Sequence, residues 1–262
     1  MAALNGKVVV IIGGTTGLGL SAASAILRAG GRVVALGRED EHVASAASAL
    51  GSGSVVIGAD ANDSMAAPSA IARAVGEFGA CHGLYHVAGG SGRAFGDGPL
   101  HEVTDEGWRR TLDLNLTSLF LSNRAAAQHF MQQGTGGAVL NMSSVLAFAP
   151  APAFFATHAY ASAKAAVIGL TTSAAAYYAK HDIRFNAIAP GLVETPMSRR
   201  ATGNEDIRAF VRARQPLDGG RVGRVEDLDA AVVYLLSDAA QFVTGQVLAI
   251  DGGWSVGGGP YS

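Results

Sequence analysis

The sequence predicts an α/β fold in which a doubly wound, mostly parallel sheet lies between two helical layers, a three-layer α/β/α arrangement. Short runs rich in β-branched residues, such as KVVVII at 7–12, alternate along the chain with longer helical patterns. The composition agrees, because 49% hydrophobic and 15% charged residues suit strands that are buried on both faces. No stretch has the composition of a linker, so we expect a single domain over residues 1–262.

The elements are expected to alternate. A strand is expected where a short apolar run stops at glycine, proline or a polar residue, and a helix where apolar residues recur at a helical period. The expected strands cover residues 7–12, 32–36, 54–58, 84–90 with its closing glycines, 137–142, 183–188 and 246–250. The expected helices cover 20–31, 41–50, 64–78, 105–133, 158–180 and 226–238, and the one over 105–133 is long enough to be broken.

Composition and charge argue against several classes of partner. The 19 basic and 21 acidic residues leave a net charge of -2 with no basic cluster, so we expect no nucleic acid and no anionic membrane as a partner. Cys81 is the only cysteine, and no long apolar run occurs, which together predict a soluble, cytoplasmic protein. His82 and His86 are about 13 Å apart if they lie in one strand, too far to share a metal ion, so no metal site is expected.

A glycine-rich turn follows the first expected strand. Residues 13–19 read GGTTGLG and lead directly into a helical pattern. Strand, glycine turn and helix are the context of a phosphate-binding loop, because glycine allows close approach and the start of a helix presents free N–H groups. The glycine spacing is longer than that of the common dinucleotide-binding turn, and a turn without a ligand is the alternative.

The end of the second expected strand bears on the choice of cofactor. An acidic residue at this place holds the ribose hydroxyls of NAD, but Gly37 and Arg38 stand there instead. A guanidinium can bind a 2′-phosphate with two hydrogen bonds, which favours NADP(H) over NAD(H). The alternatives are that Arg38 is an ordinary solvated side chain, or that Glu39 acts as the acid.

Tyr160 and Lys164 are spaced to share one face of a helix. At this i,i+4 spacing an ammonium can lie beside a phenol, and its charge favours the ionised phenolate. Taken alone, such a pair is more often a solvent-exposed contact on a helix surface without a catalytic role. Ser143 and Ser144 follow an expected strand, at the sheet edge where α/β proteins bind ligands. Asn115 lies among leucines on the long expected helix and needs hydrogen-bond partners there.

In chain order these motifs resemble the short-chain dehydrogenase/reductase family, in its single-domain Rossmann-like form, over almost the whole chain. The TGxxxGxG loop of the family falls on residues 12–19, its NNAG segment on 86–89 and its YxxxK motif on Tyr160 and Lys164. The resemblance implies catalytic roles for Asn115, Ser144, Tyr160 and Lys164. It implies cofactor contacts by Gly13, Thr15, Thr16, Gly17, Leu18, Gly19, Arg38, Asp60, Ala61, Ala88, Gly89, Tyr160, Lys164, Pro190, Gly191, Val193 and Thr195.

The same resemblance implies an oxidoreductase that moves a hydride between NADP(H) and a carbonyl or secondary alcohol. Tyr160 is then the general acid or base, Lys164 lowers its pKa, Ser144 binds the substrate oxygen, and Asn115 helps a proton relay through water. The resemblance also implies a homo-oligomer, a dimer or a tetramer. The alternative is an NADP(H)-binding sensor or scaffold without turnover, which the complete set of four residues disfavours.

The chain departs from the family pattern in several places. Ile12 replaces a threonine, His86 and Val87 replace two asparagines, and the Ser144–Tyr160 interval is longer than usual. The extra residues fall in the apolar loop 145–158, whose Leu146, Phe148, Phe154 and Phe155 predict an apolar or cyclic substrate. Residues 192–214 form a possible substrate lid that contains several arginines, and we interpret these as a solvated face, with an anion site as the alternative.

Overall fold

A parallel sheet of seven strands forms the centre of the molecule. The computed structural model describes residues 2–257. The strands are β1 (Val8–Ile12), β2 (Arg32–Gly37), β3 (Ser54–Gly58), β4 (Gly83–His86), β5 (Gly137–Met142), β6 (Ile183–Pro190) and β7 (Val247–Ile250). They lie in the order β3-β2-β1-β4-β5-β6-β7, and every neighbouring pair is parallel. The predicted fold class is confirmed.

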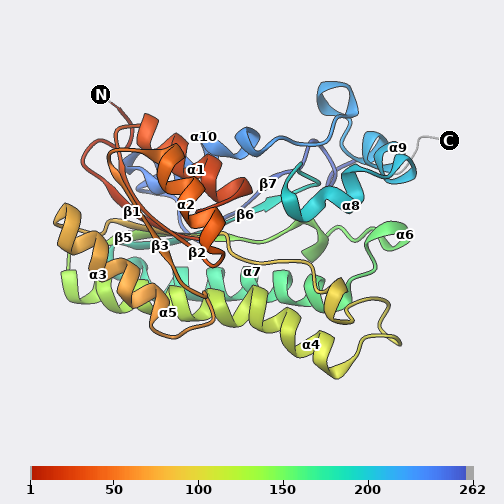
Figure 1. Ribbon diagram of the computed structural model, residues 1–262, viewed down its shortest axis with the longest axis horizontal. Coiled ribbons are helices and arrows are strands. Elements are labelled where there is room, and N and C mark those ends of the chain that lie inside the picture. The colour runs from red at the N-terminus through yellow and green to blue at the C-terminus, as the bar shows by residue number, and fades with distance from the viewer. Residues whose placement is uncertain (1, 258–262) are drawn as a thin grey trace.

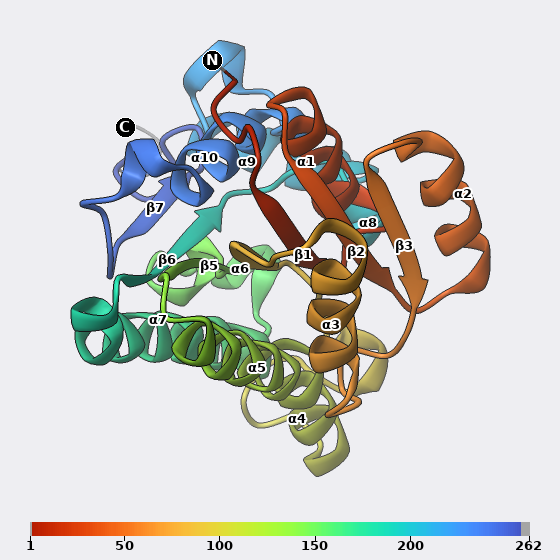
Figure 2. The same cartoon turned by 90° about the vertical axis from the view of Figure 1, so that its left-hand side faces the viewer.

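Helices cover both faces of this sheet (Figures 1 and 2). On one face lie α1 (Gly17–Arg28), α2 (Asp40–Leu50) and α10 (Asp229–Leu236). On the other lie α3 (Ala66–Phe78), α5 (Ser118–Gln133) and α7 (His158–Tyr178). Alternate strand residues serve the two layers: Val8 and Val10 pack towards α3 and α5, whereas Val9 and Ile11 pack towards α1 and α10.

The strand order places the ligand-binding edge. From β1 the chain builds outward to β2 and β3, then returns to β4 on the other side of β1. The direction of winding therefore reverses between β1 and β4, and a crevice opens at the carboxyl ends of strands at such a point. The β1–α1 turn and the residues after β4 and β5 all reach this edge.

The long helix expected over 105–133 is interrupted. It consists of α4 (Asp105–Leu112), a π-helical turn (Asp113–Thr117) and α5. Thr104 begins α4 with a side chain that accepts the N–H of Gly107 at 2.9 Å. The π-helical turn carries Asn115, so the widened part of the helix lies where the site residue was predicted.

The segment predicted as a lid is helical and packed. It contains α8 (Arg199–Thr202) and α9 (Glu205–Arg214), which lie near α6 (Pro152–Phe155) at one end of the molecule (Figure 1). Ala201, Ile207 and Val211 form a small hydrophobic cluster there with Val145, Ala151 and Trp254. The loop between Ser144 and Tyr160 thus packs against segments from much later in the chain.

Within residues 2–257, no helix is both long and apolar enough to cross a lipid bilayer. The same residues include no group of three or more His, Cys, Asp and Glu side chains arranged to hold a metal ion.

Candidate active site

A cavity of about 410 Å³ opens at the carboxyl edge of the sheet. Its walls come from the β1–α1 turn, the ends of β2 to β6, the π-helical turn, the start of α7 and the segment around α8. Every residue that the sequence predicted for catalysis or cofactor binding lines it. Residues from Gly13 to Thr195 are therefore brought together around one space.

The glycine turn at the start of α1 fits the pyrophosphate of a dinucleotide. A Cβ atom on Gly13 would lie 2.6 Å from the backbone nitrogen of Ala88, and one on Gly19 would collide with the carbonyl oxygen of Gly13. Thr16 precedes the helix without a capping side-chain bond, and the first turn of α1 contains no acidic residue. The N–H groups at this helix start are therefore available to an anion.

At the far end of the cavity Arg38 and Glu39 form an ion pair. The Nε and Nη2 atoms of Arg38 donate to Oε1 of Glu39 at 2.9 and 2.6 Å. This bond and the charge of Glu39 raise the pKa of Arg38. In the sequence these two residues were alternative determinants of the cofactor. In the structure they are bonded to each other, and both line the cavity, as Asp60 does.

Tyr160 and Lys164 lie one turn apart near the start of α7, as their spacing predicts. The Nζ atom of Lys164 lies 5.6 Å from the centre of the Tyr160 ring and donates to the carbonyl oxygen of Met142 at 3.0 Å. Lys164 is 3% exposed, and this burial lowers its pKa to about 8. Burial raises the pKa of Tyr160, and a hydrogen bond with Ser144 opposes that rise. The lowering of the Tyr160 pKa by Lys164 stays a prediction.

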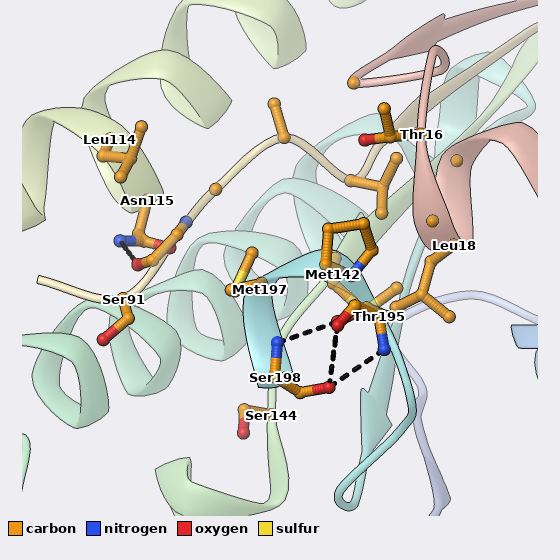
Figure 3. Close-up of a pocket in the computed structure, with 18 of the residues that line it drawn as sticks. Thr16, Leu18, Ser91, Leu114, Asn115, Met142, Ser144, Thr195, Met197 and Ser198 are labelled. Carbon is orange, nitrogen blue, oxygen red and sulfur yellow. Dashed lines mark hydrogen bonds between the residues drawn. The ribbon is translucent and has the colours of Figure 1, made fainter. Parts of the chain in front are cut away.

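The two serines after β5 have different surroundings. Ser143 is buried and donates its hydroxyl to the carbonyl oxygen of Lys164 at 2.9 Å, so it ties β5 to α7. The hydroxyl of Ser144 has one backbone contact among the described residues, the N–H of Leu146, which it accepts at 3.2 Å. Ser144 lies on the cavity wall, where Figure 3 labels it. Ser144 is therefore the serine that can reach a substrate oxygen.

Asn115 is fully buried and its amide bonds to the backbone. Its Nδ2 donates to the carbonyl oxygens of Gly90 and Thr111 at 2.9 Å each, and its Oδ1 accepts the N–H of Gly90 at 3.1 Å. Figure 3 shows this side chain directed at the loop after β4. The observed contacts fix the loop that carries Gly89 and Gly90 at the cavity. The predicted relay role of Asn115 is a separate matter and stays a prediction.

His86, which stands where the family pattern has an asparagine, contacts two serine hydroxyls of α5. Its ring is fully buried, with Nδ1 2.7 Å from the hydroxyl of Ser122 and Nε2 3.5 Å from that of Ser118. Burial, followed by the charge of Lys164, lowers the pKa of His86 to about 3. The imidazole is therefore neutral at physiological pH and joins β4 to α5.

The sequence reasoning missed Asp97, which is 5% exposed. Its Oδ1 and Oδ2 accept the backbone N–H groups of Ala159 and Tyr160 at 3.0 Å each, in the first turn of α7. A carboxylate at a helix start is favourable because it satisfies free N–H groups and complements the helix dipole. No local signal reveals this contact, since Asp97 caps a helix that begins about 60 positions later.

The wall of the cavity beside the loop between Ser144 and Tyr160 is apolar and aromatic. Leu146 and Phe155 line it as the sequence suggested, but Phe148 and Phe154 do not. The ring of Phe154 packs instead on Phe210 at 5.2 Å. Trp254, which the sequence reasoning overlooked, also lines the cavity and donates its Nε1–H to the carbonyl oxygen of Ala149 at 3.0 Å.

Comparisons with known proteins agree with this geometry. A family model described as "Enoyl-(Acyl carrier protein) reductase" matches residues 13–255. A cis-4-hydroxycyclohexanecarboxylate dehydrogenase of Sinomonas cyclohexanicum is 36% identical over 95% of this chain and 96% of its own length. A 2,5-dichloro-2,5-cyclohexadiene-1,4-diol dehydrogenase of Sphingobium indicum is 34% identical over 97% of this chain and 99% of its own.

A solved structure gives the same result. A short-chain type dehydrogenase/reductase from Mycobacterium ulcerans superposes with a TM-score of 0.90 at 31% sequence identity, covering 98% of this chain and 93% of the other. The structural similarity therefore extends over nearly the whole of this chain.

Proposed function

Because the chain belongs to the short-chain dehydrogenase/reductase family of NAD(P)(H)-dependent oxidoreductases, we propose that it interconverts a secondary alcohol and a ketone with Tyr160 as acid and base. The observation that supports this most is the meeting of Ser144, Tyr160 and Lys164 on one cavity with the glycine turn. When bound, the nicotinamide cofactor supplies or accepts the hydride. The side chains of this protein position the substrate and move the proton.

In reduction, the Tyr160 hydroxyl gives its proton to the substrate oxygen while Ser144 donates a hydrogen bond to the same oxygen. The effect of Ser144 on the pKa of Tyr160 supports this pairing, as does the fact that both side chains line the same cavity. In oxidation the same proton returns to Tyr160. Burial keeps the phenol protonated, as an acid requires before it acts.

Lys164 assists by its charge and its donors. Its ammonium is held between the Met142 carbonyl oxygen and the Tyr160 ring, and with a pKa of about 8 it is mostly protonated near neutral pH. A nearby positive charge stabilises the phenolate as Tyr160 loses its proton. By analogy with the family, Lys164 would also hold the hydroxyls of the ribose next to the nicotinamide. Asn115 completes the proposed relay through a water molecule to Lys164.

We extend the proposal to NADP(H) as the preferred cofactor, with NAD(H) second. The support is Arg38, a cation on the cavity wall where Gly37 leaves no side-chain carboxylate. A Cβ atom at position 37 would collide with the Thr15 side chain, so an acid cannot replace Gly37 in this packing. Glu39 competes with a 2′-phosphate for Arg38, and this weakens the preference without removing it.

The proposed substrate contains a six-membered carbon ring. Both named relatives act on hydroxylated rings of this size, according to their names. The walls formed by Leu146, Phe155 and Trp254 suit an apolar ring, and the volume of about 410 Å³ is in the range of small-molecule sites.

We further propose a cytoplasmic homo-oligomer, a dimer or a tetramer, that associates through α5 and α7. Phe120 and Met131 on α5 are 45% and 43% exposed, and they line a shallow groove with Leu170 of α7. Exposed apolar side chains in such a groove favour contact with a second copy. Light scattering coupled to size exclusion measures the mass, and a monomer at micromolar concentration contradicts this part of the proposal.

The test of the reaction is a panel of ring ketones and ring alcohols with NADPH, NADP+, NADH and NAD+, followed at 340 nm. The wild type should turn over at least one substrate, and Tyr160→Phe should lose this turnover while its cofactor dissociation constant stays within a few-fold of wild type. Near wild-type rates in Tyr160→Phe contradict the assigned role. Cofactor binding without turnover across the panel favours a sensor or scaffold protein instead.

A further inference from the structure

Two arginine side chains, Arg93 and Arg200, line the cavity. Arg93 belongs to the turn Arg93–Phe95 after β4, and Arg200 belongs to α8. Both line the space that Ser144 and Tyr160 also line. Within residues 2–257, no carboxylate oxygen lies within 4 Å of either guanidinium.

Both guanidiniums bring positive charge to the same cavity. Burial, followed by the charge of Arg200, lowers the pKa of Arg93. Asp97 is the acidic residue that acts on Arg93, but both of its oxygens already accept N–H groups of α7. Two positive charges that face one cavity destabilise each other, and an anion bound between them would stabilise both.

The position of Arg93 is fixed by the protein. Its Nη2 donates to the carbonyl oxygen of Phe154 at 3.0 Å, and its own N–H donates to the Ser91 hydroxyl at 3.3 Å. The remaining donors of the guanidinium have no partner among the described residues. Arg200 is placed by α8, whose Ala201 is buried in the cluster with Trp254. Arg93 is therefore anchored at the cavity by the loop that carries Phe154, whereas Arg200 is brought to the cavity by its place on α8 and its side chain is exposed.

We propose that Arg93 and Arg200 form a subsite for a carboxylate group of the substrate, so that the protein acts on anionic ring ketones and alcohols. This inference rests on the proposed function. Paired guanidiniums match the planar carboxylate with several parallel hydrogen bonds. The apolar wall of Leu146, Phe155 and Trp254 then holds the ring between the arginines and Tyr160. The arginines of the lid segment, interpreted from sequence as a solvated face, include one with this role.

The experiment compares 4-oxocyclohexanecarboxylate with its uncharged carboxamide, which has nearly the same shape. Wild-type protein is measured beside Arg200→Gln, Arg93→Gln and Arg93→Lys. The control is Arg199→Gln, since Arg199 is exposed on the same helix and does not line the cavity. Calorimetry with cyclohexanecarboxylate and the cofactor-loaded protein measures anion binding without turnover.

Wild type should have a higher kcat/KM for the carboxylate than for the carboxamide. Arg200→Gln should raise KM for the carboxylate by about 10-fold, which corresponds to the lower end of the range for a hydrogen bond to a charged group, because the site is exposed. Its KM for the carboxamide and its NADPH dissociation constant should not change. Arg93→Lys should retain part of the preference, and Arg199→Gln should match wild type. Added salt should raise KM for the carboxylate only.

Equal kcat/KM for the two ketones overturns the subsite while the reaction stands. A weaker NADPH affinity in Arg200→Gln also overturns it, because Arg200 then serves the cofactor. If neither ketone is reduced but cyclohexanecarboxylate binds to wild type and not to Arg200→Gln, the subsite stands and the proposed reaction on these rings fails. If the anion neither binds nor reacts, both proposals fail.

Discussion

The carboxylate of Asp97 accepts the backbone N–H group of Tyr160 at 3.0 Å, so the loop after β4 holds the residue that we propose as the acid. The same loop contacts the His158 ring, whose Nδ1 lies 3.0 Å from the carbonyl oxygen of Gly98. Asp97 therefore acts on the site through the backbone of α7 and has no contact with the substrate in this proposal. It is a positioning residue.

Replacing Asp97 with Ala should lower the free energy of unfolding by about 1–3 kcal/mol, since buried N–H groups lose their acceptor. kcat should fall by roughly 10-fold to 100-fold, because small displacements of a catalytic group are costly. Chemical denaturation and steady-state kinetics measure the two effects. Asp97→Asn keeps an acceptor and should recover part of both. The exposed Asp105→Ala on α4 is the control. Unchanged kcat in Asp97→Ala would show that Tyr160 does not depend on this cap.

Acid should destabilise the protein through His86. Its folded pKa of about 3 lies below the unfolded value of 6.5, so the unfolded chain binds the proton more readily between these pH values. The contribution of neutral His86 to the free energy of unfolding is thus complete above pH 6.5. It decreases by about 1.4 kcal/mol for each pH unit below that value. Between pH 7 and pH 5, wild type should lose about 2 kcal/mol more than His86→Asn. Urea unfolding at a series of pH values measures the difference. The exposed His101→Asn should follow wild type, and a parallel pH dependence in His86→Asn would refute the argument.

The Arg38–Glu39 pair should control cofactor choice. Arg38→Ala should raise KM for NADPH by roughly 10-fold to 100-fold and change KM for NADH little, because the lost bonds join two charged groups. Glu39→Gln removes the competing carboxylate and should lower KM for NADPH. Kinetics with both cofactors at saturating substrate measure these effects. If Arg38→Ala leaves KM for NADPH unchanged and Glu39→Gln weakens NADH, Glu39 is the determinant and the cofactor is NAD(H).

Trp254 should hold the loop between Ser144 and Tyr160 in place. It is 2% exposed, its ring packs on Phe155 and Phe210, and its Nε1–H bonds to Ala149. Trp254→Ala should cost about 3–5 kcal/mol, and Trp254→Phe should cost less because an aromatic ring remains. Denaturation gives these values, and limited proteolysis should cut Trp254→Ala within residues 149–158. If Trp254→Ala resists proteolysis as well as the wild type does, the loop is held by other contacts.

Local patterns predicted most of the fold. Short apolar runs located all seven strands, although the one expected over 84–90 ends at His86, and glycines marked the turn before α1, because these signals act over a few residues. The predicted site residues also share one cavity, since the carboxyl ends of parallel strands meet at one edge. The π-helical turn at Asn115 was not specified, because a helical period does not distinguish one extra residue in a turn.

Contacts between distant segments could not be predicted. Asp97 caps a helix from another part of the chain, Phe154 packs on Phe210 and does not line the cavity, and Arg93 and Arg200 line the same cavity. Each depends on how segments that are far apart in sequence are brought together by the fold. The Arg38–Glu39 bond is the exception, since neighbouring residues make it and the sequence left both possibilities open.

The position of Trp254 also sets the order in which the site can form. The glycine turn and the strands that support it are synthesised first and pair with their neighbours in sequence, β1 with β2 and β2 with β3. The aromatic wall beyond Tyr160 needs Trp254, which leaves the ribosome after every other residue of that wall. During synthesis this wall therefore stays without its indole ring until nearly the whole of the rest of the chain has been made.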